Sequence, residues 1–414
     1  MAHLLIWIIS ALGIAVMLFR PFKLPEAVGA TAGAILLCVL KLIPLPLAGK
    51  AIAEGLDVYL FLTGMMFLSE LARDHGVFDW VANIAVRRSR GSSIRLFTLI
   101  YAVGTVVTIF MSNDATAVVL TPAVLAAVKR AKAQPLPYLL GCAFIANAAS
   151  FVLPISNPAN LVVFDSALPP LIHWLAMFTL PSIASVAITY LLLRWFSRRE
   201  LSPACNGSIA DVHLSAVGHT CLFGIIATAV LLIVASACKW DLGLPTFLAA
   251  LAVAIAATLQ SRSNPFKLIR EVSWSVLPLV AALFVIVEAI KSAGATAMLR
   301  AGLERMLQWP AYCSAFGVGA TVAFGANLFN NLPVGLIAGS TLRSIPFQAM
   351  LAKVVLIAID LGPNLSITGS LATILWLIAI RREGVHVSGW DFFRIGILVM
   401  PVTLFFAIVA VLVF

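Results

Sequence analysis

Long apolar segments run through this chain of 414 residues and restrict the folds open to it. A helix needs about 20 apolar residues to cross the roughly 30 Å hydrocarbon core of a bilayer. With 62% apolar and 11% charged residues, the composition is typical of a polytopic membrane protein. We therefore predict an all-α protein with about ten transmembrane spans, at residues 3–20, 24–43, 57–72, 137–167, 171–196, 215–236, 245–260, 276–291, 347–380 and 396–414.

Two further apolar stretches, 96–128 and 312–341, are interrupted near their centres by polar residues, at 112–114 and 327–331. Each stretch is too short to cross a bilayer twice. We interpret both as re-entrant hairpins, with tips in the segments FMSNDATAVVLTP (110–122) and NLFNNLPVGLIAGS (327–340). Irregular backbone at membrane depth is tolerated where protein or a wet cavity surrounds it, so the tips are expected to face a cavity.

The two halves of the chain match when they are shifted against each other. A shift of 218 aligns Glu70 with Glu288, Arg73 with Lys291, Gly76 with Gly294 and Asn113 with Asn331. A shift of 213 aligns Asn147 with Asp360 and Ala159 with Ala372. Five spans is an odd number, so the second half would enter the membrane from the opposite side, as in the inverted repeats of secondary transporters. We expect repeats at 1–200 and 215–414, joined by a polar cytoplasmic linker at 201–214.

The net charge of +10 marks topology in such a chain, rather than affinity for nucleic acid. If the cluster Arg87, Arg88, Arg90, Arg95, Lys129, Arg130 and Lys132 is cytoplasmic, the alternation of spans places nineteen Lys and Arg residues inside and seven outside. This excess predicts that both termini lie on the side of the membrane opposite the cytoplasm. The stretch 77–90 is interpreted as an amphipathic helix on the cytoplasmic surface.

Two of the predicted spans are interrupted at mid-membrane. LPISNPAN (153–160) carries two prolines that cannot donate backbone hydrogen bonds, and DLGPNLSITGSLAT (360–373) has a similar glycine and proline break. Half-helix ends and hairpin tips would converge there, offering free N–H groups and carbonyls to a solute. The predicted site is rich in amides and hydroxyls and contains no arginine, which favours a small neutral polyol or weak acid over a dianion.

Several charged residues near these breaks have competing interpretations. Asp114 is either a helix N-cap or a buried carboxyl that carries a proton. Asp360 and Lys353 are seven residues apart and are predicted to form either a fixed ion pair or a switchable one that a proton opens. For Glu70 and Glu288, a cation three residues further on favours local i,i+3 ion pairs over a paired functional role.

Other classes of function lack their sequence signals. The six cysteines are scattered without a CxxC motif and the histidines are dispersed, so we expect no metal site, no disulfide framework and no cofactor. No HExxH, GxGD or GxxxxGK[ST] motif is present, so an intramembrane enzyme and an ATP-hydrolysing subunit are disfavoured.

The two tip segments, together with DLGPNLSITGSLATILWL (360–377) leading into Arg381 and Arg382, resemble the bacterial arsenite and antimonite efflux permeases of the ion-transporter superfamily. The resemblance covers nearly the whole chain. It implies export of arsenous acid and antimonite in exchange for protons, sometimes with a separate soluble ATPase subunit. Cys142 alone lies on a broken helix, so hydrogen bonding of the hydroxide is expected in place of capture by thiolates.

From the residues and this resemblance we predict two sets of site residues. Those expected to bind substrate are Ser112, Asn113, Asn157, Asn160, Asn330, Asn331, Thr368 and Ser370. Those expected to couple transport to protons are Asp114, Asp360 and Lys353. A sodium/proton antiporter of the same superfamily is the nearest alternative, because carboxylates beside helix breaks also suit Na⁺. A dicarboxylate symporter comes third, because the site lacks an obvious cation.

Overall fold

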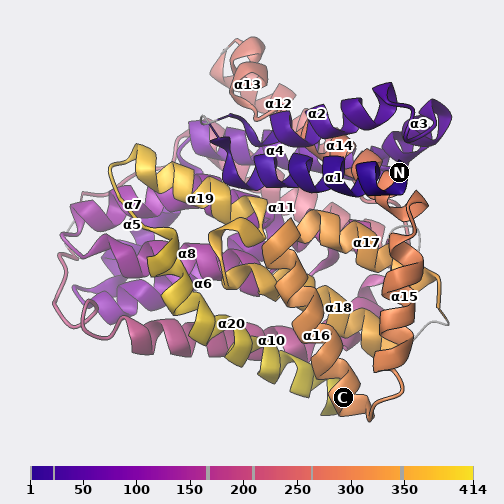
Figure 1. Cartoon of the computed structure of the whole chain (residues 1–414). Coiled ribbons are helices and arrows are strands. Elements are labelled where there is room, and N and C mark those ends of the chain that lie inside the picture. The colour runs from indigo at the N-terminus through magenta and orange to yellow at the C-terminus, as the bar shows by residue number, and fades with distance from the viewer. Residues whose placement is uncertain are drawn as a thin grey trace.

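The computed structural model describes residues 2–21, 24–164, 168–207, 210–262, 264–345 and 349–413, and within these ranges it is helical without any β-strand. Seven of the described helices are individually long and apolar enough to cross a membrane, and two bent helix pairs raise the number to nine. The prediction of an all-α, multi-pass membrane protein is therefore confirmed. Figure 1 shows the helices packed side by side, with most of their axes running in one general direction.

One set of helices, here named the scaffold group, comes from the beginning and middle of the chain. Its members pack mainly against one another, notably α4 on α12, α1 on α2 and α2 on α14. The group consists of α1 (Ala2–Phe19), α2 (Glu26–Val39), α3 (Leu45–Glu54), α4 (Leu56–Asp74), α11 (Ala216–Ala237), α12 (Gly243–Ser261), α13 (Pro265–Glu271) and α14 (Val276–Ser292).

A second set, the hairpin group, contains both predicted hairpins and both broken helices. Its first half comprises α6 (Ser93–Met111), the π-helical turn η2 (Ala115–Leu120), α7 (Thr121–Arg130), α8 (Pro135–Ala148), η3 (Pro154–Ser156), α9 (Pro158–Phe164) and α10 (Leu171–Phe196). Its second half comprises α16 (Ala311–Phe329), α17 (Asn331–Arg343), α18 (Ala349–Leu361), η5 (Gly362–Asn364), η6 (Ile367–Gly369), α19 (Leu371–Arg382) and α20 (Gly389–Val413). Helices α5 (Val77–Ser89) and α15 (Ala295–Met306) join the two groups.

Local sequence explains the main boundaries. Ser92 caps α6 by accepting a hydrogen bond from the Arg95 backbone N–H at 3.3 Å, and Pro135 begins α8, where its missing N–H costs nothing. Every residue of α8 from Pro137 onward is buried, so this helix is apolar all round and lies inside the bundle.

The helices follow the predicted spans closely, with two differences. The hairpin breaks are narrower than expected, because Asn113 is already helical after Ser112 and Asn327 is still helical before Asn330. Helices α3, α13 and α15 were not anticipated; α3 and α15 bend from their neighbours by 46° and 72°. Parts of the predicted spans 137–167 and 347–380, at residues 165–167 and 347–348, lie outside the described residues.

Backbone features recur at the spacing of 218 that the sequence shows. Gly76 (φ 72°) and Gly294 (φ 95°) precede α5 and α15 in left-handed conformations. Ser112 (φ 116°, ψ 162°) and Asn330 (φ 72°, ψ 152°) occupy the two hairpin tips. Few residues with a side chain adopt such angles, so the two tips share an unusual conformation as well as an aligned position.

One end of the molecule gathers the basic cluster and the linker. Arg87 on α5 forms an ion pair with Asp211 of the linker, and Asn83 donates to the Ala210 carbonyl at 3.0 Å. The hydrogen bond from the Arg87 guanidinium holds the pKa of Asp211 below its usual range. Both chain termini lie at the opposite end of the molecule from α5 and α7 (Figure 1).

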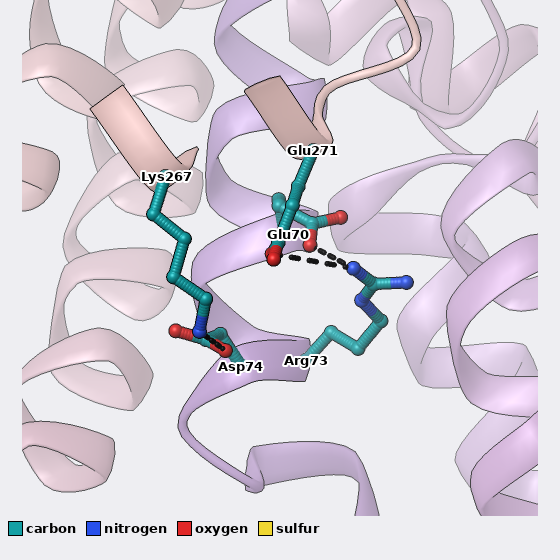
Figure 2. Close-up of polar contacts among 5 residues, drawn as sticks. All are labelled: Glu70, Arg73, Asp74, Lys267 and Glu271. Carbon is teal, nitrogen blue, oxygen red and sulfur yellow. Dashed lines mark hydrogen bonds and ion pairs between the residues drawn. The ribbon is translucent and has the colours of Figure 1, made fainter. Parts of the chain in front are cut away.

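The two local ion pairs predicted from i,i+3 spacing are present. Glu70 pairs with Arg73, and Glu288 pairs with Lys291 at 2.6 Å. Figure 2 shows that Arg73 also reaches Glu271 of α13, at 3.5 Å, while Lys267 bonds to Asp74 at 2.6 Å. These contacts fasten the end of α4 to α13.

Candidate functional site

The two hairpin tips bring asparagine side chains to the middle of the bundle. The chain leaves α6 at Ser112, and Asn113 and Asp114 open the returning helix. In the second hairpin, Asn330 caps α17 by accepting a hydrogen bond from the Leu332 N–H at 3.4 Å, and its amide donates to the Thr368 carbonyl at 3.4 Å. The second tip is thereby joined to the break between α18 and α19.

Asn160 holds the first helix break together. Prolines 154 and 158 cannot donate backbone hydrogen bonds, and carbonyls are left free where α8 stops. The Asn160 amide donates to the carbonyls of Ser150, Leu153 and Pro154, at 2.8, 3.2 and 3.3 Å. A freed carbonyl inside the bundle would otherwise be costly, so this side chain has a structural task.

The two broken helices exchange a crossed pair of side-chain hydrogen bonds. At the end of α18, Asp360 accepts from the amide of Asn157, at the start of α9, at 2.7 Å. At the end of α8, Asn147 accepts from the Ser370 hydroxyl, at the start of α19, at 3.2 Å. The shift of 213 that aligns Asn147 with Asp360 also aligns Asn157 with Ser370, so each bond is the positional counterpart of the other.

A small cavity, here named the central cavity, lies where the hairpin group meets the scaffold group. It offers about 40 Å³ to the centre of a water-sized probe, which suits one small polar solute or a few waters. Its wall is made by Met17, Leu62, Asn113, Asp114, Asn157, Pro158, Val276, Leu279, Val280, Leu283, Asn330, Asn331, Leu332, Leu371, Ala372 and Ile374.

All the polar residues of the central cavity wall come from the hairpin group. This group supplies four asparagines and Asp114 together with five apolar residues, whereas α14, α4 and α1 supply aliphatic side chains and Met17. Among the described lining residues there is no lysine, arginine, histidine or cysteine. This arrangement can orient a small uncharged solute by hydrogen bonds, while the apolar side chains exclude water.

Within the part of the chain that the structure describes, three acceptors of the predicted site residues have no hydrogen-bond partner. They are Oδ1 of Asn113, which is 3% exposed, and Oδ1 of Asn160 and Oδ2 of Asp360, which are fully buried. A buried acceptor left without a partner costs about 1–3 kcal/mol, so each of these atoms favours an incoming O–H donor or a proton. Asp360 does not line the cavity itself; Asn157 stands between the two.

Of the residues predicted to bind substrate, the structure brings Asn113, Asn157, Asn330 and Asn331 together around the central cavity, beside Asp114. The others do not line it. Ser112 forms the bend of the tip and Asn160 holds the helix break. The Thr368 hydroxyl donates to the Asn327 carbonyl at 3.2 Å, and Ser370 caps α19 through the Thr373 N–H at 3.1 Å.

Lys353 and Asp360 both lie on α18, but among the described residues no ion pair joins them, so the structure lacks the predicted fixed pair and the switchable pair stays a prediction. Seven residues correspond to two helical turns, so the two side chains would have to span about 10 Å along the helix axis to form an ion pair. Asp360 has the amide of Asn157 as its partner instead.

Several residues of the site were not selected from the sequence. Asn147 and Asn364 pair at 3.0 Å, and Asn364 also donates to the Phe144 carbonyl at 3.0 Å. The alignment of Asn147 with Asp360 was a usable signal for this pair. The apolar wall from α14 had none, because Leu279 and Leu283 look like any lipid-facing leucines.

Comparison with known proteins places the chain among membrane transporters. A family model described as a citrate transporter matches residues 4–380. An arsenical pump membrane protein of Escherichia coli is 27% identical, with 97% of this chain and 96% of the relative covered. Another, from Yersinia enterocolitica, is 29% identical, with 84% and 83% covered.

Among solved structures, the YdaH transporter of Alcanivorax borkumensis, described as having an unusual topology, is similar with a TM-score of 0.58 at 14% identity. The similarity covers 88% of this chain and 86% of that one. At this identity the comparison speaks for the fold alone. Together, the family model and the relatives identify a multi-pass protein that transports ions or small solutes across a membrane.

Proposed function

The chain belongs to the citrate transporter family, and we propose that it is a secondary active transporter that exports arsenite and antimonite, as their neutral hydroxides, from the cytoplasm. The observation that carries this proposal is the central cavity, whose polar wall consists of amides and one carboxyl. The names of its relatives, which are arsenical pump membrane proteins, support the same substrate.

The chemistry of the cavity favours arsenous acid over a carboxylate substrate. Recognition of a dicarboxylate or citrate is favoured by fixed cations, typically arginine, and the described wall offers none. Arsenous acid is a small molecule with three O–H donors. The unpartnered Oδ1 of Asn113 and the carboxyl of Asp114 are acceptors of the kind that such donors require.

Proton coupling is assigned to Asp360, with Asp114 as the second carboxyl. Asp360 is buried, and Asn157, whose amide donates to it, lines the cavity. A charged carboxylate in such a place is expensive, so arrival and loss of a proton would change the strength of this link. Protonation of Asp360 would then change how the Asn157 side chain binds the solute.

The driving force is sufficient for a neutral solute. One inward proton contributes about 2.3 kcal/mol per 100 mV, which corresponds to roughly a 50-fold outward concentration ratio, since 1.4 kcal/mol is tenfold. No nucleotide chemistry is needed in this chain. A soluble arsenite-stimulated ATPase subunit is a proposed partner, as the resemblance implies, and we propose that the chain itself is not an enzyme.

The proposed setting is the bacterial inner membrane, with both termini in the periplasm and the basic cluster in the cytoplasm. We also propose that residues 1–200 and 215–414 are inverted repeats. The crossed bonds of the broken helices and the matched backbone angles at Ser112 and Asn330 support this division.

Everted membrane vesicles test the proposal, because their cytoplasmic face is outside. Wild-type vesicles should take up arsenite when an interior-acid proton gradient is imposed, and arsenite should release protons from the lumen. Asp360→Asn should lower the gradient-driven part at least tenfold, whereas Glu304→Gln at an exposed surface ion pair should behave as wild type. An unchanged proton dependence in Asp360→Asn would remove this carboxyl from coupling and turn attention to Asp114→Asn.

A sodium/proton antiporter is the second candidate function, because Asp114 lines the cavity beside four asparagine amides that could surround Na⁺. The same vesicles separate the two functions. Proton release stimulated by sodium, with no response to arsenite or antimonite, would favour the antiporter and reject arsenite export.

A further inference from the structure

A second cavity lies along the same line of contact between the scaffold group and the hairpin group. It offers about 50 Å³ to the centre of a water-sized probe, slightly more than the central cavity. Part of its wall is charged or polar, and this part includes Glu54, Glu288, Lys291, Ser340 and Arg343. It is named here the outer cavity, because Lys291 lies two residues before Ala293, whose carbonyl contacts the ring of His3 near the N-terminus.

The same helices line both cavities, one turn apart. On α17, Leu332 faces the central cavity and Leu336 faces the outer one. On α4, Leu62 faces the central cavity and Val58, four residues earlier, faces the outer one. Residues four apart share one face of a helix, so a single continuous seam passes both cavities.

Helices α14 and α9 continue this register. Leu283 of α14 lines the central cavity and Phe284, with Val287 beyond it, lines the outer one. Pro158 at the start of α9 lines the central cavity and Leu161 lines the outer one. On each of these four helices, the residue that lines the outer cavity lies next to or one turn from the residue that lines the central cavity. The four helices therefore define one path from the central cavity to the outer cavity.

A matching charged cluster lies at the end of α4 that is far from the outer cavity. The shift of 218 relates the pair Glu288 and Lys291 to Glu70 and Arg73. Arg73 also contacts Glu271 of the neighbouring helix α13, so this cluster joins two helices (Figure 2). In the described part of the chain, Lys291 is paired with Glu288 of its own helix alone, and Glu54 of α3 has no ion pair.

We propose that the outer cavity is an exit site on the transport path, which takes the small hydroxylated solute after it leaves the central cavity. This inference rests on the proposed function. Ser340 and Glu288 supply a hydroxyl and carboxylate oxygens for O–H donors, and Leu336 with Phe284 forms the apolar layer that the solute must pass. The charged residues of the wall can hydrogen-bond to water as well as to the solute. The solute can therefore exchange its contacts with them for contacts with water when it leaves for the periplasm.

Filling the outer cavity tests this assignment. The two tryptophan variants are Ser340→Trp, which fills it from α17, and Val287→Trp, which fills it from α14; Glu304→Gln, at an exposed ion pair outside both cavities, is the control. Arsenite uptake by everted vesicles should fall at least tenfold in both tryptophan variants and stay within about threefold of wild type in Glu304→Gln. Equilibrium binding of arsenite to each purified protein should remain at the wild-type level, because the central cavity is untouched.

The outcomes separate the two proposals. Wild-type transport rates in both tryptophan variants would overturn the exit site and leave the proposed function standing. Loss of arsenite binding in both variants would also overturn it, since the outer cavity would then not be a separate site. Wild-type vesicles that take up no arsenite would refute the proposed function, and the same variants would then be judged by sodium-stimulated proton flux, with the same tenfold criterion.

Discussion

A glycine in place of Ser112 should stabilise the folded protein. Ser112 has φ 116° and ψ 162°, in a region of backbone space that is essentially reserved for glycine. A residue with a Cβ held there stores about 1–3 kcal/mol of strain. Glycine also gives the unfolded chain more freedom, which costs about 0.5–1 kcal/mol. The expected net gain in the free energy of unfolding is therefore about 0.5–2 kcal/mol.

Thermal unfolding in detergent, followed by tryptophan fluorescence, measures this gain. For a chain of this size about 1 kcal/mol corresponds to roughly 1 °C, so Ser112→Gly should raise the Tm by about 1–2 °C. Ser112→Ala is the matched control, because it keeps the Cβ and removes the hydroxyl. If Ser112→Ala melts at or above the temperature of Ser112→Gly, the gain does not come from backbone strain and the reasoning is wrong.

Two further substitutions test the helix breaks. Asn147→Ala removes the donor to Asn364 and leaves that buried amide oxygen without its partner, so the free energy of unfolding should fall by about 1–3 kcal/mol; a melting temperature equal to that of wild type would contradict this. Asn160→Ala frees three carbonyls of the first break, and hydrogen exchange at residues 150–160 should speed up while α10 stays protected. Equal exchange in mutant and wild type would show that Asn160 does not hold the break.

The positions of the breaks could be predicted from the sequence because they depend on local chemistry. Polar residues inside apolar runs located Asn113 and Asn331, and prolines located the break before Asn157. All three now line one cavity. Their convergence could be anticipated because shifts of 218 and 213 residues align the two halves of the chain. In an inverted repeat, the aligned hairpin tips and helix breaks meet near the middle of the membrane.

The remaining features depend on contacts between distant segments. Ser370 and Asn160 were expected at the substrate, but both are used to satisfy backbone groups at helix ends. Sequence cannot tell a substrate ligand from such a cap, because the same amides and hydroxyls serve both. Similarly, the partner of Asp360 is an amide 203 residues away and not the lysine two turns back on the same helix.

The two crossed bonds of the broken helices differ in charge, because one of them contains an ionisable group and the other does not. One bond joins Asn147 to Ser370, a pair that is neutral at every pH. The other joins Asn157 to Asp360, a pair that can gain or lose a charge. An architecture with two matching positions thus carries a carboxyl at one of them, Asp360, while the matching Asn147 cannot bind a proton. Asn147→Asp would give the molecule a second acid at the matching place, turning a one-site titration into a coupled pair.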